Sequence, residues 1–166
     1  LVNPGFEQGL EGWSVEGDTQ VVPWSDAFPA AWRGTRAPVP EGRRVLVTRT
    51  SAGAEARFGQ TVRHLVPGQL YKLKLYVADQ EWSRRAIPAG IAIENVEPQA
   101  DLAEHRVWAV DDTPRAWTMH LRVFRARAES ARLTIRVTGG LATSGDPTPN
   151  PLFWDFVQVE PYCDGD

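Results

Sequence analysis

Two carboxylates near the ends of the chain stand in settings that suit a hard metal ion. Glu7 ends the run Asn-Pro-Gly-Phe-Glu, in which a turn-forming segment leads into an apolar residue and a carboxylate. Asp155 is embedded in the apolar run Phe-Trp-Asp-Phe-Val. Because both acidic groups lie among apolar residues at opposite ends of the sequence, we expect the two termini to meet in space. A hard cation such as Ca²⁺ could neutralise both carboxylates there.

A second kind of chemistry is indicated by aromatic residues that stand beside polar ones. The C–H face of a sugar packs on a Trp or Tyr ring, and Asp, Glu, Asn, Gln or Arg side chains bind its hydroxyls. The candidate sugar ligands are Trp24 near Asp26, Trp32 next to Arg33, Trp82 with Arg84 and Arg85, Tyr76, and Trp108 near Arg106 and Asp111. The alternative is that these rings belong to the hydrophobic core, which is the place we expect for Trp13, Trp117 and Trp154.

Catalytic motifs are missing from the sequence. It contains no G-x-S-x-G elbow, no H-E-x-x-H, no C-x-x-C and no phosphate-binding loop. The three histidines, His64, His105 and His120, are scattered along the chain. Glu94 and Glu97 could be imagined as the carboxylate pair of a glycosidase, but their spacing in sequence does not establish the facing separation that this reaction needs. We therefore expect a protein that is not an enzyme.

Length and composition indicate one globular domain. The 166 residues are enough to bury a hydrophobic core, and the net charge of −3 implies no general attraction to nucleic acid. No apolar run is long enough to cross a membrane. The single Cys163 cannot form an internal disulfide. We expect the domain to cover residues 1–162, with 163–166 as a tail or the start of a linker. Because the first residue is Leu1 rather than Met, we expect the chain to have been cut from a larger precursor or to be an expressed fragment. We also expect the domain to be part of a larger multidomain chain.

Hydrophobic and polar residues alternate in many short segments, which is typical of strands. This pattern predicts strands at residues 43–50, 57–64, 70–79, 89–95, 117–124, 130–138 and 152–160. So many short strands, with 14 glycines and 13 prolines in the chain, predict an all-β fold, an antiparallel β-sandwich of jelly-roll type. Only residues 99–105 show a helical period. Long loops are expected at residues 24–42 and 139–151.

The alternation also assigns a face to each side chain. The residues expected to face the core are Tyr71, Leu73, Leu75 and Val77 in one strand, and Trp117, Met119, Leu121 and Val123 in another. The basic residues expected to point away from the core are Lys72, Lys74, His120, Arg122, Arg132 and Arg136. One interpretation is affinity for an anionic polysaccharide such as a uronate polymer. The interpretation we favour is surface solubility, with neighbouring Glu and Asp residues cancelling the charge.

Several motifs together resemble a known family. They are Asn-Pro-Gly-Phe-Glu at 3–7, Gly-Trp at 12–13, Gln-Thr-Val at 60–62, Leu-Val-Pro-Gly-Gln-Leu-Tyr at 65–71 and Trp-Asp-Phe-Val-Gln-Val at 154–159. In this combination the chain resembles the galactose-binding-like jelly-roll domains. More narrowly, it resembles the carbohydrate-binding modules attached to xylanases and glucanases. The resemblance extends over nearly the whole chain.

The resemblance implies a non-catalytic accessory module that binds a polysaccharide or oligosaccharide. It also implies an extracellular or cell-surface bacterial protein that neither binds nucleic acid nor inserts into a membrane. A structural Ca²⁺ is implied with Glu7 and Asp155 as side-chain ligands and backbone oxygens near Gly42 and Arg44 completing the shell. If there were no metal, Asp155 would hydrogen-bond the N-terminal backbone and Glu7 would be solvated. Two other functions remain open, a structural or protein-interaction sandwich without a sugar site and a polysaccharide lyase or hydrolase.

Overall fold

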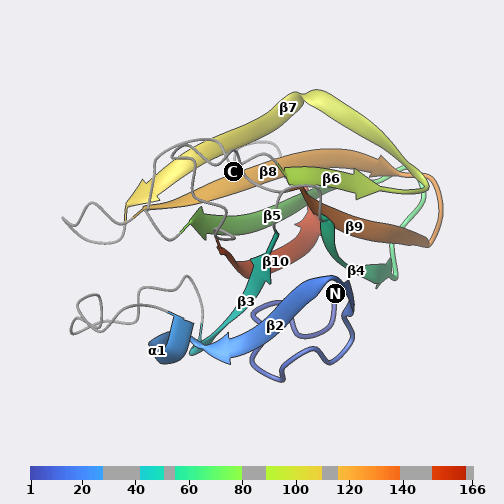
Figure 1. The fold of residues 1–166 in the computed structure, drawn as a ribbon. Coiled ribbons are helices and arrows are strands. Elements are labelled where there is room, and N and C mark those ends of the chain that lie inside the picture. Colours follow the sequence, from blue (N-terminus) through green and yellow to red (C-terminus); the bar gives the residue numbers. More distant parts are fainter. Residues whose placement is uncertain (28–41, 51–54, 80–88, 110–115, 139–150, 164–166) are drawn as a thin grey trace.

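The computed structural model describes residues 1–27, 42–50, 55–79, 89–109, 116–138 and 151–163. In this part of the chain two antiparallel sheets lie face to face, accompanied by one short helix (Figure 1). The larger sheet has six strands in the order β2-β3-β10-β5-β8-β7, and the smaller has four in the order β1-β4-β9-β6. The antiparallel β-sandwich predicted from the alternation is therefore confirmed.

The strands of the six-stranded sheet are β2 (Asp18–Pro23), β3 (Arg44–Arg49), β10 (Leu152–Pro161), β5 (Leu70–Asp79), β8 (Ala116–Ala126) and β7 (Val96–Ala109). Those of the four-stranded sheet are β1 (Ser14–Glu16), β4 (Glu55–Arg63), β9 (Ser130–Thr138) and β6 (Ala89–Ile93). The helix α1 (Trp24–Ala27) follows β2 directly. In Figure 1 the six-stranded sheet runs from β7 at the top to β2 at the bottom.

All seven predicted strands are present, and each end agrees with the structure to within two residues. The sequence pattern missed β1, β2 and β7. The helical period proposed for residues 99–105 is wrong, because these residues belong to β7 and the strand pairs with β8 on both sides of an irregularity between Gln99 and Glu104. Pairing with β8 in the sheet outweighs the local helix preference of this segment.

The main hydrophobic core fills the space between the two sheets. It includes Leu73 and Leu75 from β5 and Phe58 and Ile135 from the four-stranded sheet, each at most 1% exposed. Phe58 meets Trp154 edge to face, with ring centroids 5.2 Å apart. Full burial of a side chain of this kind contributes roughly 1.5–3 kcal/mol. The core position predicted for Trp154 is confirmed by its exposure of 0%.

A tight turn joins β4 to β5 at the predicted Pro67-Gly68 position. The Gln69 amide donates to the Val66 carbonyl at 3.1 Å. Gly68 has φ +87°, a conformation that residues with a Cβ rarely adopt. The prediction of a turn here is therefore confirmed.

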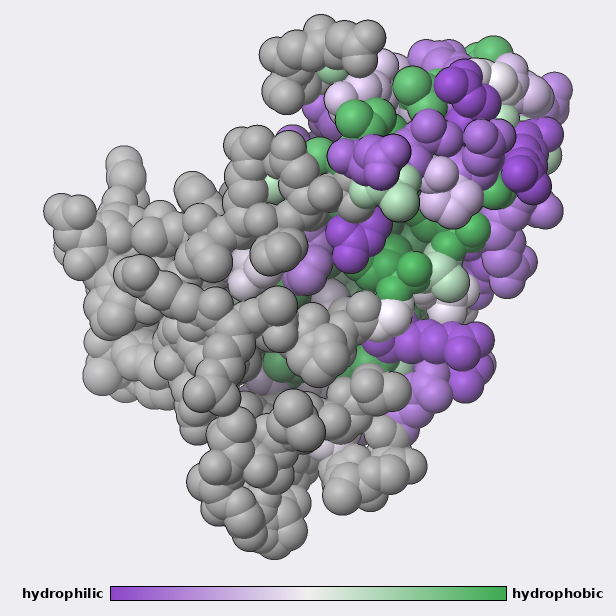
Figure 2. Space-filling model, turned by 90° about the horizontal axis from the view of Figure 1, so that it is seen from above, coloured by the Kyte–Doolittle hydropathy of each residue, from purple (hydrophilic) through white to green (hydrophobic). Residues whose placement is uncertain are grey.

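Large hydrophobic side chains are exposed at only a few separate positions of the sequence among the described residues. Val2, Val66 and Leu102 are the large hydrophobic side chains that are exposed among the described residues. Figure 2 shows hydrophilic and hydrophobic residues interspersed over one face, with hydrophilic ones at its margin. No helix in the described ranges is long and apolar enough to span a membrane.

Candidate functional site

A second hydrophobic cluster lies on the face of the six-stranded sheet that points away from the four-stranded sheet, which we call the outer face. The cluster consists of Val45, Val47, Ala78, Trp117 and Phe153, and it is separate from the core between the sheets. Partly buried Val22, Trp24, Ala27 and Tyr76 pack against it. Both faces of this sheet are therefore apolar over part of their area.

The faces assigned to β8 are corrected by the strand register. Leu73 and Leu75 belong to the core between the sheets, and they pair with Arg122 and His120 respectively. Directly paired residues of antiparallel strands project from the same face of the sheet. The expectation that His120 and Arg122 point away from the packed side is therefore wrong, and His120 is only 7% exposed. Hydrophobic alternation separates the two faces of a strand, but it does not say which face the other sheet covers.

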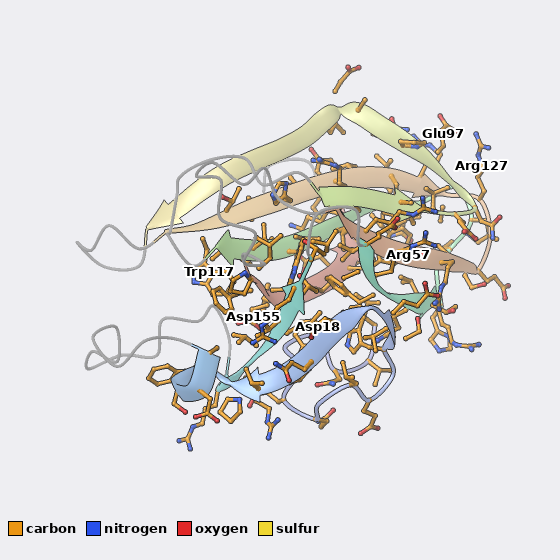
Figure 3. The ribbon with its side chains drawn as sticks, viewed as in Figure 1. Asp18, Arg57, Glu97, Trp117, Arg127 and Asp155 are labelled. Carbon is orange, nitrogen blue, oxygen red and sulfur yellow. The ribbon has the colours of Figure 1, made fainter. Side chains whose placement is uncertain are left out.

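The outer face of β8 consequently carries Trp117, Met119 and Leu121, which were expected to face the core. Trp117 is 0% exposed, so its predicted burial is confirmed, although its partners are the residues of the second cluster. In Figure 3 Trp117 lies at the end of the sandwich where β5 ends, whereas Arg57, Glu97 and Arg127 lie towards the opposite end.

Along β5 the outer face changes from apolar to charged. Tyr76 pairs with Asp155 of β10 on one side and with Met119 of β8 on the other. The next outer-face residue, Lys74, pairs with Gln158 and Leu121. Lys72 then pairs with Glu160 and Val123. An aromatic end and a polar end are thus brought together on one sheet face.

Tyr76 links the two ends of this face. Its ring meets that of Phe156 edge to face, with centroids 5.9 Å apart, and it packs against the second cluster. Burial raises the pKa of the Tyr76 phenol above its ordinary value, because tyrosinate is poorly solvated there. The ring is nevertheless only half-buried. It therefore offers partly exposed aromatic surface next to polar side chains.

Trp24 begins α1 and is likewise half-buried against the second cluster. Its backbone amide donates to the Arg43 carbonyl at 3.0 Å, which holds the start of the helix against the segment before β3. The neighbouring Asp26 is exposed and accepts a hydrogen bond from the Ser25 hydroxyl at 3.2 Å. Trp24 and Tyr76 are the two predicted sugar ligands whose side chains the structure describes.

The other predicted sugar ligands cannot be placed in the same way. Trp32 and Trp82, with Arg84 and Arg85, lie outside the described residues. For Trp108 the structure describes the backbone, in which it is the register partner of Trp117. Among the residues that sequence reasoning did not propose are Met119, Leu121 and Gln158, which share the outer face with Tyr76 and Lys74. The strand register, which the sequence does not reveal, places them there.

The basic residues expected to point away from the core are divided between the two sheets. Lys72 and Lys74 are in the six-stranded sheet, whereas Arg132 and Arg136 are in the four-stranded one. Lys72 lies on the outer face, away from the core between the sheets as expected, but it is only 7% exposed. Nearby carboxylates do offset part of the charge, as expected, because Glu160 pairs with both lysines and Glu55 with Arg136.

The two ends of the chain meet as expected. The Val157 amide donates to the Pro4 carbonyl at 3.0 Å. Asn3 organises the N-terminal segment, since its side-chain amide donates to the Gly9 carbonyl at 2.9 Å and its Oδ1 accepts from the Gln8 amide at 3.0 Å. The Trp13 indole, 7% exposed and in the core as predicted, donates to the Asn3 carbonyl at 2.9 Å.

The predicted metal ligands lie at this junction. Glu7 is exposed, and its Oε1 accepts hydrogen bonds from the amides of Arg43 at 2.7 Å and Arg44 at 2.8 Å. Gly42 makes this approach possible, because a Cβ at that position would collide with the Glu7 carboxylate. Asp155 is 0% exposed, and its Oδ1 accepts from the Phe156 amide at 2.7 Å. In the described part of the chain no three His, Cys, Asp or Glu side chains gather as a metal site, so a cation here would also need backbone or water oxygens.

Comparison with known proteins places the fold. No protein-family model and no curated protein matches the sequence. Among solved structures, the carbohydrate-binding module TmCBM61 in complex with β-1,4-galactotriose is 15% identical, with a TM-score of 0.54 over 98% of this chain and 97% of that chain. The chain has the fold of a carbohydrate-binding module. The predicted resemblance to such galactose-binding-like domains is confirmed at the level of the fold.

The same carbohydrate-binding-module fold matches part of a larger protein. The enzymatically active domain of bacteriophage CBA120 tailspike protein 4 is 13% identical, with a TM-score of 0.57 over 98% of this chain. This chain spans 21% of that tailspike chain. The likeness therefore concerns one segment of the tailspike structure, and at this identity it describes architecture rather than activity.

Proposed function

We propose that this domain is a non-catalytic carbohydrate-binding module whose glycan lies on the outer face of the six-stranded sheet. The observation that carries the proposal is the placement of the half-buried Tyr76 ring beside Lys74 and Gln158 on one face. An aromatic ring accepts the C–H face of a sugar, and adjacent polar side chains bind the hydroxyls at its edge. The fold that the chain shares with a galactotriose-binding module supports the same function.

The outer face is poorly suited to glycoside hydrolysis. That reaction uses two carboxyl groups facing each other across the scissile bond. Of the carboxylates on this face, the two that β10 contributes are unsuited to this role, because Asp155 is fully buried and Glu160 is paired with lysine. A binding role that needs no carboxylate chemistry fits these residues better than a hydrolase or lyase role does.

We propose that the protein is extracellular or at a cell surface, where polysaccharides are accessible. We also propose that the domain is one part of a larger chain. A structural Ca²⁺ would bind at Glu7 and Asp155, with backbone oxygens near Gly42 and Arg44. Ca²⁺ accepts six to eight oxygen ligands of mixed type, including carboxylates and backbone carbonyls. Two observations support this site. The Glu7 carboxylate lies directly against Gly42, and Asp155 is buried near the junction of the termini.

Binding can be tested with β-1,4-galactan, xylan and polygalacturonate, using retention in affinity gels and calorimetry with the calcium-loaded protein. We expect one of these glycans to bind and Tyr76→Ala or Trp24→Ala to weaken binding by about tenfold, because each removes a stacking ring. Tyr76→Phe keeps the ring and is the matched control. It should retain most of the affinity.

A structural domain without a sugar site predicts a different result. No glycan would bind, and tryptophan fluorescence would not change on addition of any of them. That outcome would reject the binding function. Release of reducing ends or of unsaturated products from a polysaccharide would show instead that the domain is an enzyme.

A further inference from the structure

Phe156 differs from the other residues of β10 because its backbone has a conformation that phenylalanine rarely adopts. Its φ is 52°, in the left-handed region that favours glycine, and a bulky side chain is strained there. The strand pairing is irregular at the same point. Between Asp155 and Gln158, two residues of β10 lie opposite a single residue of β5. This irregularity has the form of a β-bulge, a feature that redirects a side chain and often lies next to a functional site.

The bulge brings Phe156 to the outer face. Trp154 and Val157 both belong to the core between the sheets, although they lie three positions apart and strict alternation would place them on opposite faces. The two residues between them therefore project to the other side. The ring of Phe156 accordingly meets the ring of Tyr76 on the outer face, with centroids 5.9 Å apart and an angle of 65° between the planes. Without the bulge, position 156 would face the core.

Hydrogen bonds from both sides hold the backbone of the bulge. The Phe156 amide donates to Asp155 Oδ1 at 2.7 Å, and the Val157 amide donates to the Pro4 carbonyl at 3.0 Å. Both amides of the bulge thus have acceptors outside β5. The surrounding structure therefore keeps Phe156 in its strained conformation.

Core packing does not account for this strain. Phe6 has a similar φ of 58°, but its side chain is 0% exposed and packs in the main core, so burial offsets the strain. Phe156 is only half-buried, and it belongs to neither of the two hydrophobic clusters of the described residues. Backbone strain of this kind is concentrated at active sites and ligand-binding sites. The conformation of Phe156 therefore indicates a function for its ring on the outer face.

We propose that Phe156 is a second sugar-binding ring, which the bulge of β10 holds beside Tyr76. The proposal rests on the proposed function, because it adds a binding residue to the same outer face. Two planes at 65° cannot both lie flat against one sugar face, so the two rings form a corner rather than a flat platform. A sugar stacked on one ring contacts the other ring with its edge. One sugar residue is therefore bound by both rings.

The alternative is that the bulge serves the junction of the termini alone, by placing Asp155 and the Val157 amide. In that case the ring of Phe156 can be removed without any effect on glycan binding. A sugar-binding ring predicts instead that affinity depends on the aromatic side chain, whereas stability depends on the backbone conformation at position 156. Substitutions at this position separate the two properties.

The experiment compares three variants of Phe156 by calorimetry with β-1,4-galactan, xylan and polygalacturonate. Phe156→Gly and Phe156→Ala both remove the ring, but glycine accepts a positive φ and alanine does not. We expect both to bind the glycan about tenfold more weakly than the wild type, because each loses one aromatic contact. Phe156→Gly should nevertheless unfold at a higher urea concentration than Phe156→Ala. Phe156→Tyr keeps the ring and should retain most of the affinity.

His64→Gly is the matched control for the backbone. His64 has φ 62° and is exposed directly after β4 of the four-stranded sheet, so glycine there relieves a similar strain away from the outer face. This variant should bind the glycan as tightly as the wild type. Thermal melting of each variant confirms that it is folded.

A double-mutant cycle tests whether both rings bind the same sugar. Tyr76→Ala and Phe156→Gly are measured singly and together. The double variant should lose less affinity than the product of the two single losses, because either change alone already disrupts the contacts of that sugar. Strictly multiplicative losses would show that the two rings do not form a shared corner.

The failure of this inference can be distinguished from that of the proposed function. If Phe156→Gly and Phe156→Ala keep the wild-type affinity while Tyr76→Ala loses it, the outer face binds glycan but Phe156 is not part of the site. If the affinities of the Phe156 variants follow their stabilities rather than the presence of the ring, the residue has only a structural role. If no glycan binds to the wild type, the proposed function fails together with this inference.

Discussion

Gly42 and Glu7 are in such close contact that a Cβ added to Gly42 would lie under 3.0 Å from the Glu7 carboxylate. The glycine also has φ +65°, which side chains with a Cβ rarely adopt. Through this contact the N-terminal segment reaches the start of β3, where Glu7 accepts its two backbone hydrogen bonds. The contact therefore determines both local stability and the geometry of the proposed metal site.

Gly42→Ala should destabilise the domain by about 2–4 kcal/mol, because it combines an unfavourable backbone conformation with loss of the charged hydrogen bonds of Glu7. Gly68→Ala is the matched control. Gly68 has a similarly positive φ of +87°, but nothing lies within 4 Å of the added Cβ, so a loss of about 1 kcal/mol is expected. Urea unfolding of both variants measures the difference, and equal losses would show that contact with Glu7 is unimportant.

Removal of metal tests the proposed calcium site. Protein first shown to contain Ca²⁺ should melt about 5–10 °C lower after chelation, if the ion is present at roughly a hundred times its dissociation constant. Asp155→Asn and Glu7→Gln should each melt lower than the wild type and should lose the response to chelator. An unchanged Tm in the loaded wild-type protein would argue against a structural ion.

The buried hydrogen bond between Trp154 and Thr48 can be measured by a double-mutant cycle. Trp154 Nε1 donates to Thr48 Oγ1 at 2.9 Å, and the two residues are 0% and 1% exposed. Thr48→Val keeps the volume but removes the acceptor, which should cost about 1–3 kcal/mol of unfolding free energy. Trp154→Phe should cost more, because it also leaves a cavity. The double variant should lose less than the sum of the single losses, whereas strict additivity would show that the bond contributes no coupling energy.

Asn3 should be difficult to replace, because it combines φ 52° with three side-chain hydrogen bonds to the N-terminal segment. Asn3→Ala loses both features, whereas Asn3→Gly loses the bonds but accepts the backbone conformation. We expect both variants to be destabilised, with alanine worse than glycine by about 1 kcal/mol. Chemical denaturation would contradict this if alanine proved the milder change.

Tyr76 should make the stability depend on pH in alkaline solution. Burial raises its folded-state pKa above the ordinary value of 10.0, so the unfolded chain loses the phenol proton first. Well below pH 10 the Tyr76 phenol is protonated in both the folded and the unfolded state, so it does not change the stability. As the pH rises above this value, the unfolded state binds fewer protons than the folded state, and stability falls.

Comparison of the wild type with Tyr76→Phe isolates this contribution. The difference in unfolding free energy between them should be constant below about pH 9.5 and should change in favour of the variant at higher pH. Denaturant unfolding at several pH values provides the measurement. Parallel pH profiles for the two proteins would mean that burial does not perturb Tyr76.

The sequence by itself determined the strands with clear alternation and the closure of the termini. The apolar and polar residues of β9, and those of β5 from Tyr71 to Leu75, alternate by parity, and a period of two is compatible with a strand but not with a helix. The Asn-Pro-Gly-Phe-Glu and Trp-Asp-Phe-Val segments likewise indicated that the ends meet, which the bond between Val157 and Pro4 confirms. Alternation is local to each segment, so the sequence specifies it directly, whereas the meeting of the ends is a long-range contact that the sequence indicated through the two carboxylates placed among apolar residues.

Only the tertiary structure decided which side of each strand became the outer face. Trp117 and His120 both occur in β8, and parity places them on opposite faces without saying which one meets the other sheet. The pairing of His120 with Leu75 decides this, and that pairing depends on β5, which is distant in sequence. The convergence of Lys72 and Lys74 on Glu160 likewise requires β5 and β10 to be neighbours in a particular register. Strand order and register arise from long-range packing, so alternation within one segment cannot specify them.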